Sequence, residues 1–259
     1  MNEEQILIHN LKVNLKILGE GEPLLILHGW GSSSDSWKEV QRILAGQGLK
    51  VIVPDLPGFG KSVTPGKPWG VQDYKDFVLS LTEKLKIPHF YLLGHSFGGR
   101  IAIRLAKEHP EKIKNLILCD SAGIKPQPGF KTKMFFLTAR LGNILFSPKP
   151  LRRLKAAFQN MFYLFLRNRD YVKANGNMRE TIKKVLAEDL KPELSEVKTK
   201  TLLIWGERDK MVPLEYAYLF NESLPNSQLE ILPKTGHSPH LEAPEKLSKI
   251  ISNFLKNKT

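Results

Sequence analysis

The chain of 259 residues has a single cysteine, Cys119, so no disulfide can form within it. A fold without disulfides must rest on a hydrophobic core, and a reducing compartment is expected. The N-terminal residues are acidic where a secretory signal would be basic, and no apolar stretch is long enough to span a bilayer. We therefore expect a cytoplasmic protein in which Cys119 is buried at a strand end rather than catalytic.

Positive charge is in excess, and it is unevenly placed along the chain. The net charge is +13, and residues 125–200 hold 17 lysines and arginines against 6 acidic residues. A solvated helical face is the first interpretation of this excess. Contact with a membrane or micelle surface, or with an anionic substrate, is the second. Nucleic-acid binding is disfavoured because it needs basic residues lined along a groove, and the sequence leaves the oligomeric state open.

Short apolar runs alternate with stretches of helical periodicity through most of the chain. Fully apolar runs are typical of parallel strands that are buried on both faces, so the pattern predicts an α/β sheet covered by helices on both sides. Strands are expected at 5–9, 12–18, 24–27, 51–53, 90–93, 113–119, 201–205 and 228–232. Helices are expected at about 32–45, 73–86, 101–109, 214–223 and 244–256.

The alternation stops between residues 125 and 195, where apolar side chains follow one helical stripe and no strand pattern occurs. We expect an α/β core of residues 1–124 and 196–259 and an inserted helical cap of residues 125–195. Most aromatic residues of the cap are expected to hold it together, and one or two to form an apolar wall of a substrate pocket. The candidates for that wall are Phe135, Phe136, Phe158, Phe162 and Phe165.

The pentapeptide Gly94-His95-Ser96-Phe97-Gly98 lies between an expected strand and an expected helix. A serine in such a turn takes a strained backbone that projects its hydroxyl outward, and the flanking glycines allow close approach of neighbouring chain. The helix that follows directs its N-terminal dipole and free N–H groups at the site. Ser96 is therefore the expected nucleophile, and the Phe97 amide is one expected donor to the oxyanion.

A serine nucleophile needs a histidine base that is oriented by a carboxylate. Asp209 and His237 each follow an expected strand, in the order serine, acid, histidine, so we assign them as acid and base. Asp120, at the end of an earlier strand, is the second choice of acid, and Glu207 is the third. The remaining histidines considered for the base are expected to lie at the surface; these are His89, His109 and His240.

The segment His28-Gly29-Trp30-Gly31 ends another expected strand. A loop at this place can direct a second backbone N–H at the oxyanion, and we assign that role to the Trp30 amide. A simple glycine turn is the alternative if the segment is taken alone. The residues expected to support the two turns are His28, Gly29, Gly31, Gly94, His95 and Gly98.

Together these motifs resemble the α/β-hydrolase family over nearly the whole chain. The resemblance implies a mostly parallel, twisted eight-stranded sheet with helices on both faces and an inserted helical cap. It also implies the triad of Ser96, His237 and Asp209, and it makes Asp55 a structural turn residue. The similar segments are HGWG (28–31), DLPGFGKS (55–62), GHSFGG (94–99), WGERD (205–209) and GHSPHLEAPE (236–245).

The resemblance favours cleavage of carboxylic esters with small or medium apolar acyl or aryl groups, through an acyl-enzyme and without a metal or organic cofactor. Family members with an aspartate nucleophile, the haloalkane dehalogenases and epoxide hydrolases, are disfavoured by Ser96. Hydrolases that cleave carbon–carbon bonds of ring-fission products are similar but usually have asparagine in place of His95. They are the first alternative, followed by cofactor-free haloperoxidases, and a small-molecule receptor is the alternative outside enzymes.

Overall fold

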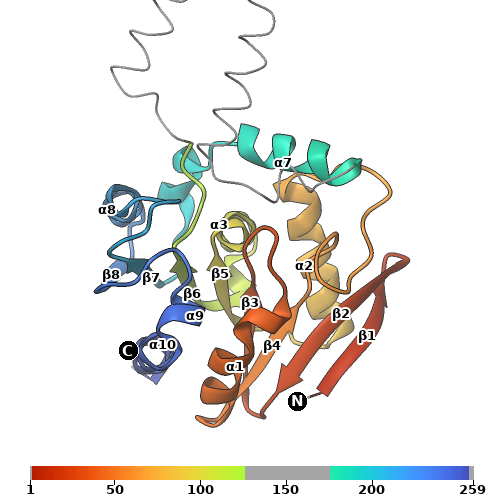
Figure 1. The fold of residues 1–259 in the computed structure, drawn as a ribbon, viewed down its shortest axis with the longest axis horizontal. Helices are drawn as coiled ribbons and strands as arrows, with labels where there is room; N and C mark the ends of the chain where they lie inside the picture. Colours follow the sequence, from red (N-terminus) through yellow and green to blue (C-terminus); the bar gives the residue numbers. More distant parts are fainter. Residues whose placement is uncertain (1, 126–175, 257–259) are drawn as a thin grey trace, which may run out of the picture.

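The computed structural model describes residues 2–125 and 176–256, which fold around one eight-stranded sheet (Figure 1). The strand order is β1-β2-β4-β3-β5-β6-β7-β8. The β1–β2 and β2–β4 pairs are antiparallel and all others are parallel, so the expected mostly parallel sheet is confirmed. The strands are β1 Asn2–Ile8, β2 Leu11–Leu18, β3 Glu22–Leu27, β4 Leu49–Pro54, β5 Phe90–His95, β6 Ile113–Cys119, β7 Thr201–Gly206 and β8 Ser227–Leu232.

The central strands are apolar along nearly their whole length because helices cover both faces of the sheet. Every residue of β7 is buried, as is the second half of β3. Successive side chains alternate between the two faces. Leu24 and Ile26 belong to one hydrophobic cluster, and Leu25 and Leu27 belong to the other. The core therefore consists of two apolar layers separated by the sheet.

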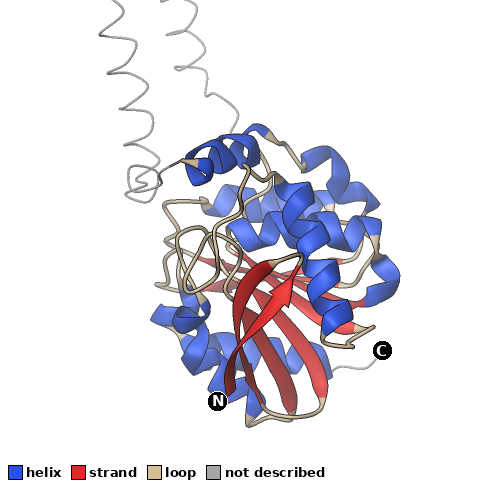
Figure 2. Ribbon diagram, turned by 90° about the vertical axis from the view of Figure 1, so that its right-hand side faces the viewer, coloured by secondary structure: helices blue, strands red, loops and turns tan. Residues whose placement is uncertain are grey.

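The helices are distributed over these two layers (Figure 2). The helices α1 (Lys38–Ala45) and α10 (Pro244–Lys256) pack on one face. The other face carries α2 (Val71–Lys84), α3 (Phe97–Glu108) and α8 (Leu214–Ser223). The shorter helices are η1 (Ser34–Trp37), η2 (Pro110–Lys112) and α9 (Pro239–Glu242). Among the helices of the described residues, none combines the length and the apolar composition that crossing a bilayer requires.

Residues 176–196 return the chain to the sheet through two helical segments, α7 (Asn177–Ala187) and η3 (Lys191–Glu196). Two hydrogen bonds join this return to the end of the preceding segment: the Leu190 amide donates to the Gly123 carbonyl at 2.9 Å, and the Lys125 amide donates to Asp189 at 3.1 Å. Residues 126–175, which include all five phenylalanines proposed for the pocket, lie outside the described residues. The division into core and cap therefore stays a prediction.

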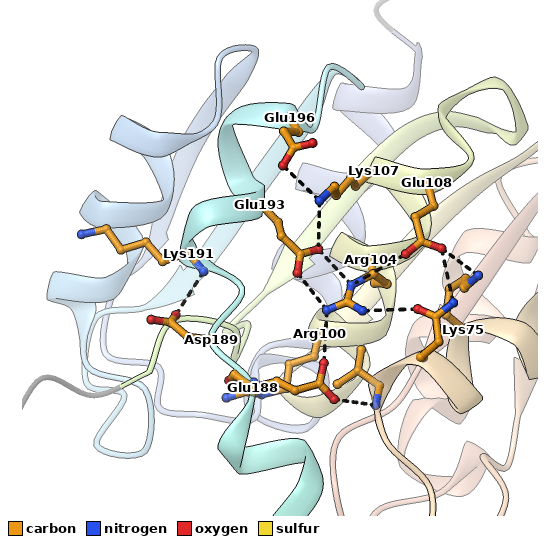
Figure 3. Close-up of polar contacts among 12 residues, drawn as sticks. Lys75, Arg100, Arg104, Lys107, Glu108, Glu188, Asp189, Lys191, Glu193 and Glu196 are labelled. Atoms are coloured by element: carbon orange, nitrogen blue, oxygen red, sulfur yellow. Dashed lines mark hydrogen bonds and ion pairs between the residues drawn. The ribbon is translucent and has the colours of Figure 1, made fainter.

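An ion-pair network attaches residues 188–196 to α3 (Figure 3). The Arg104 guanidinium donates to both carboxylate oxygens of Glu193, at 2.8 and 2.9 Å, and to Glu188 at 3.1 Å. Lys107 pairs with Glu196 at 3.0 Å. The Arg104 side chain is only 16% exposed, so water screens these pairs less than it would screen a pair at the open surface. The network thus fixes the chain that leads into β7 against α3, the helix that begins directly after Ser96.

Candidate active site

Ser96 stands between the last residue of β5 and the first residue of α3, where the chain reverses direction. Its backbone has φ 51° and ψ −112°, which an L-residue with a side chain rarely adopts. Its amide donates to the Cys119 carbonyl at 3.1 Å, and its carbonyl accepts from the Gly99 and Ala122 amides at 3.0 and 3.1 Å. These three hydrogen bonds tie the strained residue to the ends of β6 and α3. Helix α3 begins at Phe97, four residues before the start expected from its apolar pattern.

The glycines around Ser96 are required by close contacts between backbones. A Cβ at Gly98 would lie 2.1 Å from the Leu27 carbonyl oxygen, at the end of β3. A Cβ at Gly94 would lie 2.6 Å from the Gly98 carbonyl oxygen. Both contacts are with main-chain atoms that cannot rotate away, so only glycine lets α3 start this close to the strands. This packing delivers the N-terminus of α3 to the serine.

The three residues assigned to the triad are in contact. His237 Nε2 lies 3.0 Å from the Ser96 hydroxyl oxygen, and His237 Nδ1 lies 2.7 Å from Asp209 Oδ2. The other Asp209 oxygen accepts from the Met211 and Val212 amides at 2.7 and 3.0 Å. Because Asp209 accepts at Nδ1, the proton of a neutral imidazole sits there, and Nε2 is free to accept the serine proton. The Asp209 side chain is fully buried, whereas the imidazole is 13% exposed.

The loop of residues 28–31, which carries the Trp30 amide expected to bind the oxyanion, is fixed by a buried histidine. His28 Nε2 accepts from the Leu56 amide at 3.0 Å, so Nδ1 carries the proton and donates to the Gly29 carbonyl at 2.7 Å. The Ser32 amide also donates to that carbonyl, at 3.2 Å. In a trans peptide the carbonyl and the next N–H point in opposite directions. Fixing the Gly29 carbonyl therefore also fixes the direction of the Trp30 N–H.

The expected oxyanion donors adjoin the nucleophile in space. A Cβ at Gly29 would come within 3.3 Å of the Ser96 Cβ, so the loop lies directly against the serine. The Trp30 ring packs edge-on against Phe97, with ring centroids 5.3 Å apart. Within the described residues, neither the Trp30 nor the Phe97 amide donates to a protein acceptor. Two backbone N–H groups beside Ser96 are thus available for an anionic oxygen.

A group of buried aromatic rings lies next to His237, and sequence reasoning missed it. The expectation that His240 lies at the surface is wrong: it is 3% exposed, and its ring stacks on Trp37 with centroids 4.3 Å apart and planes within 6°. Burial lowers the pKa of His240 to about 3. His95 is also buried, and its Nε2 donates to the His237 carbonyl at 2.8 Å. Trp37 and His240 are far apart in the sequence, so only the fold reveals their contact.

The competing acids take other positions. Asp120 is fully buried beside Asp209, and its Oδ1 accepts from the Gly206 amide at 2.9 Å. Burial, followed by the neighbouring Asp209 charge, raises the pKa of Asp120 to about 9. Glu207 accepts from the Lys234 amide at 2.7 Å instead of approaching His237. Asp55 accepts from the Ser34 amide at 2.6 Å, consistent with the structural role expected for it.

One group of potential metal-binding side chains occurs among the described residues, and it is part of this same cluster. One ligand atom from each of Asp120, Asp209 and His237 lies within 4.8 Å of the others. Asp209 Oδ2 and His237 Nδ1 of this group are already joined by a hydrogen bond. The arrangement is that of a hydrogen-bonded chain of acid, imidazole and hydroxyl, which supports nucleophilic catalysis.

Comparison with known proteins gives consistent matches. A family model described as alpha/beta hydrolase fold matches residues 22–244. The 2-hydroxy-6-oxo-6-phenylhexa-2,4-dienoate hydrolase of Burkholderia cepacia is 28% identical over 96% of this chain and 93% of its own length. The 2-hydroxymuconate semialdehyde hydrolase of Pseudomonas putida is 27% identical over 97% of this chain and 93% of its own length. An esterase structure from Exiguobacterium antarcticum aligns with TM-score 0.76 and 24% identity, covering 99% of this chain and 100% of that one.

Proposed function

This chain belongs to the α/β-hydrolase fold family, and from that premise we propose that it is a serine hydrolase that cleaves carboxylic esters with apolar acyl or aryl groups. The observation that carries the proposal is the continuous contact from Asp209 through His237 to the Ser96 hydroxyl. Such a contact serves to activate an alcohol that is otherwise a weak nucleophile. The roles of Ser96, His237 and Asp209 given below are part of the proposal.

The reaction begins when His237 Nε2 takes the proton of Ser96 as its oxygen attacks the acyl carbon. Negative charge then develops on the carbonyl oxygen, and the Trp30 and Phe97 amides donate to it. The imidazolium returns the proton to the leaving alcohol, and an ester between Ser96 and the acyl group remains. Water attacks this ester with the same histidine as base, and the free acid leaves. Asp209 stays ionised throughout and stabilises the imidazolium.

Cleavage of a carbon–carbon bond in ring-fission products is the second candidate. The hydrolases of 2-hydroxy-6-oxo-6-phenylhexa-2,4-dienoate and of 2-hydroxymuconate semialdehyde favour this candidate, because both relatives match nearly the whole chain. The position of His95 argues for the ester. Enzymes of the carbon–carbon type usually have asparagine there, whereas His95 is buried and its Nε2 is engaged by the His237 carbonyl. The His95 side chain is therefore directed toward the loop that carries His237, and its Nε2–H is not available to a substrate.

Labelling with a fluorophosphonate tests the nucleophile. We expect one adduct on Ser96 by peptide mass spectrometry, and no adduct in Ser96→Ala. The matched control is Ser227→Ala, a serine at the start of β8 that hydrogen-bonds to Asn221; it should label like the parent chain. Labelling of Ser96→Ala at the parental rate would contradict the assignment.

The substrate class is tested by comparing two kinds of compound on the same preparation. We expect p-nitrophenyl esters to be cleaved with a higher kcat/KM than 2-hydroxy-6-oxo-6-phenylhexa-2,4-dienoate. Ser96→Ala should reduce either activity by at least about 10³-fold, the usual effect of removing a triad serine. The opposite preference between the two compounds would favour the carbon–carbon hydrolase. Turnover of both at the rate of Ser96→Ala would favour a receptor.

A further inference from the structure

Asp120 is the one carboxyl group that the proposed mechanism leaves without a role although it lies inside the catalytic cluster. It follows the last residue of β6, and its backbone has φ 44°, in the left-handed region. Its amide donates to the Ile204 carbonyl at 2.9 Å, and its Oδ1 accepts from the Gly206 amide at 2.9 Å. The side chain is therefore held rigidly between the ends of β6 and β7, with no exposure to water.

In the part of the chain that the structure describes, the groups that affect Asp120 most strongly supply no lysine or arginine charge to balance an ionised carboxylate. Its own strand contributes the neutral thiol of Cys119, 3.7 Å from Oδ2. The segment after β7 contributes Asp209, one of whose carboxylate oxygens lies within 4.8 Å of a carboxylate oxygen of Asp120. His237 approaches from the segment after β8. On the adjacent β5, His95 pairs in register with Cys119 and is buried, and burial holds its pKa well below the usual range. Among the described residues, no lysine or arginine is one of the groups that affect Asp120 most strongly.

Two adjacent buried carboxyl groups do not both ionise, because each negative charge opposes the other and water does not screen them. Asp209 has the means to remain charged, since two amides and the imidazole donate to it. Asp120 has one backbone donor, from Gly206, and the weak thiol. If the two carboxyl groups share one proton, this comparison of their donors puts that proton on Asp120.

We propose that Asp120 is a positioning residue that remains protonated at neutral pH and donates its proton in a hydrogen bond to the catalytic carboxylate of Asp209. The unit of Asp120, Asp209 and His237 then carries one negative charge when the imidazole is neutral. This donor holds Asp209 in the direction that meets Nδ1. It also limits the charge behind the imidazole, since a second negative charge would favour the protonated imidazole, which cannot accept the Ser96 proton. The catalytic consequence rests on the proposed function, but the location of the proton does not.

The first test measures stability, which does not depend on activity. The unfolded chain releases the Asp120 proton near pH 4 and the folded chain near pH 9, so the folded chain holds one extra proton between these values. Raising the pH in this window favours unfolding, by up to about ten-fold in the unfolding equilibrium constant per pH unit. Asp120→Asn removes this dependence. Its stability relative to the parent chain, measured by urea unfolding, should rise steadily from pH 5 to pH 9.

The control for this test is Asp76→Asn, the same change at an exposed position of α2. A difference between Asp120→Asn and the parent chain that varies with pH no more than the difference for this control would overturn the proposal. Where Asp120→Asn fails to fold, infrared spectra of the parent chain with labelled aspartate carboxyls answer the same question. A protonated-carboxyl band at pH 7 that is lost as the pH passes about 9 supports the proposal, and its absence at pH 7 overturns it.

The second test measures the pH profile of ester hydrolysis. An amide is neutral and can donate as the protonated acid does, so Asp120→Asn should keep the acidic limb of kcat/KM within about 0.3 pH unit of the parent chain. If Asp120 is ionised in the parent chain, Asp120→Asn removes a negative charge near His237. The acidic limb of kcat/KM in the variant would then move to lower pH by about one unit or more, which would contradict the proposal. Asp120→Ala, which lacks a donor, should lower kcat about ten-fold with KM little changed. If the parent chain hydrolyses no ester, the proposed function fails, while the stability and infrared results still decide where the proton lies.

Discussion

His28 Nδ1 donates to the Gly29 carbonyl across 2.7 Å, which fixes the peptide group whose N–H belongs to Trp30. We expect His28→Ala to lower kcat for ester hydrolysis by about ten- to a hundred-fold with little change in KM, because the oxyanion exists only during reaction. The measurement is steady-state kinetics at a temperature where circular dichroism shows the variant folded. His89→Ala is the control, since His89 bonds a backbone carbonyl at the exposed surface; an equal loss in both variants would refute the positional role of His28.

His240 should make the fold sensitive to acid. Its pKa is about 3 when folded and near 6.5 when unfolded, so between these values the unfolded chain holds the extra proton and acidification favours unfolding. His240→Phe keeps a ring against Trp37 and removes this effect. From pH 7.5 to pH 5 we expect the variant to gain about 2 kcal/mol relative to the parent chain in urea unfolding. His89→Phe, the same change at an exposed position, is the control, and a pH dependence for His240→Phe no larger than that of the control would count against the buried neutral imidazole.

Gly98 and Gly46 should respond in opposite ways to alanine. The Gly98 Cβ would meet the Leu27 carbonyl oxygen at 2.1 Å, and relieving that clash requires α3 to move away from β3. We expect Gly98→Ala to cost more than about 3 kcal/mol or to prevent folding. Gly46 has φ −63° and no neighbour nearer than 3.5 Å. Gly46→Ala should therefore be neutral or stabilise by up to about 1 kcal/mol. The measurement is thermal unfolding of the two variants. Similar melting temperatures would show that the contact at Gly98 does not exclude a side chain.

The Arg104 network should depend on guanidinium geometry. Lysine cannot bind both oxygens of Glu193 and reach Glu188 at the same time. We expect Arg104→Lys to lose about 1–2 kcal/mol in urea unfolding, because three partly shielded contacts are affected. Arg42→Lys is the matched change in an exposed pair with Glu39 and should cost less than about 0.5 kcal/mol. Equal losses in the two variants would mean that the network in Figure 3 contributes no more than a surface pair.

The sequence was sufficient to predict the sheet and the residues that meet at its edge. Fully apolar runs mark the buried strands, and Ser96, Asp209 and His237 each follow such a run. In a parallel sheet these carboxyl ends lie along one edge, so residues distant in the sequence come together there. Their contact at 3.0 and 2.7 Å follows from that topology. Asp120 also ends a strand, and the sequence ranks it second to Asp209 without excluding it, because the choice depends on which loop turns its carboxylate toward Nδ1.

The features that the sequence did not predict, the burial of His240 and the start of α3, depend on contacts with residues far along the chain. His240 lies in a polar stretch, and no local pattern indicates that Trp37, some 200 residues earlier, covers its ring. The sequence pattern predicts too late a start for α3, because two glycines follow Phe97 and glycine is a poor helix former. Packing against the strand ends overrides that local preference. Local propensity therefore placed the elements, but tertiary contacts set their ends and buried the polar side chains.

The backbone of Ser96, with φ 51°, is one that glycine would adopt at ease and serine adopts only under constraint. The replacement Ser96→Gly would thus produce a chain that resists heat better while it loses the hydroxyl that we propose as the nucleophile. A laboratory selection that rewards thermal endurance alone would drive this protein toward an inert variant. Any programme to improve it must score catalysis and melting together.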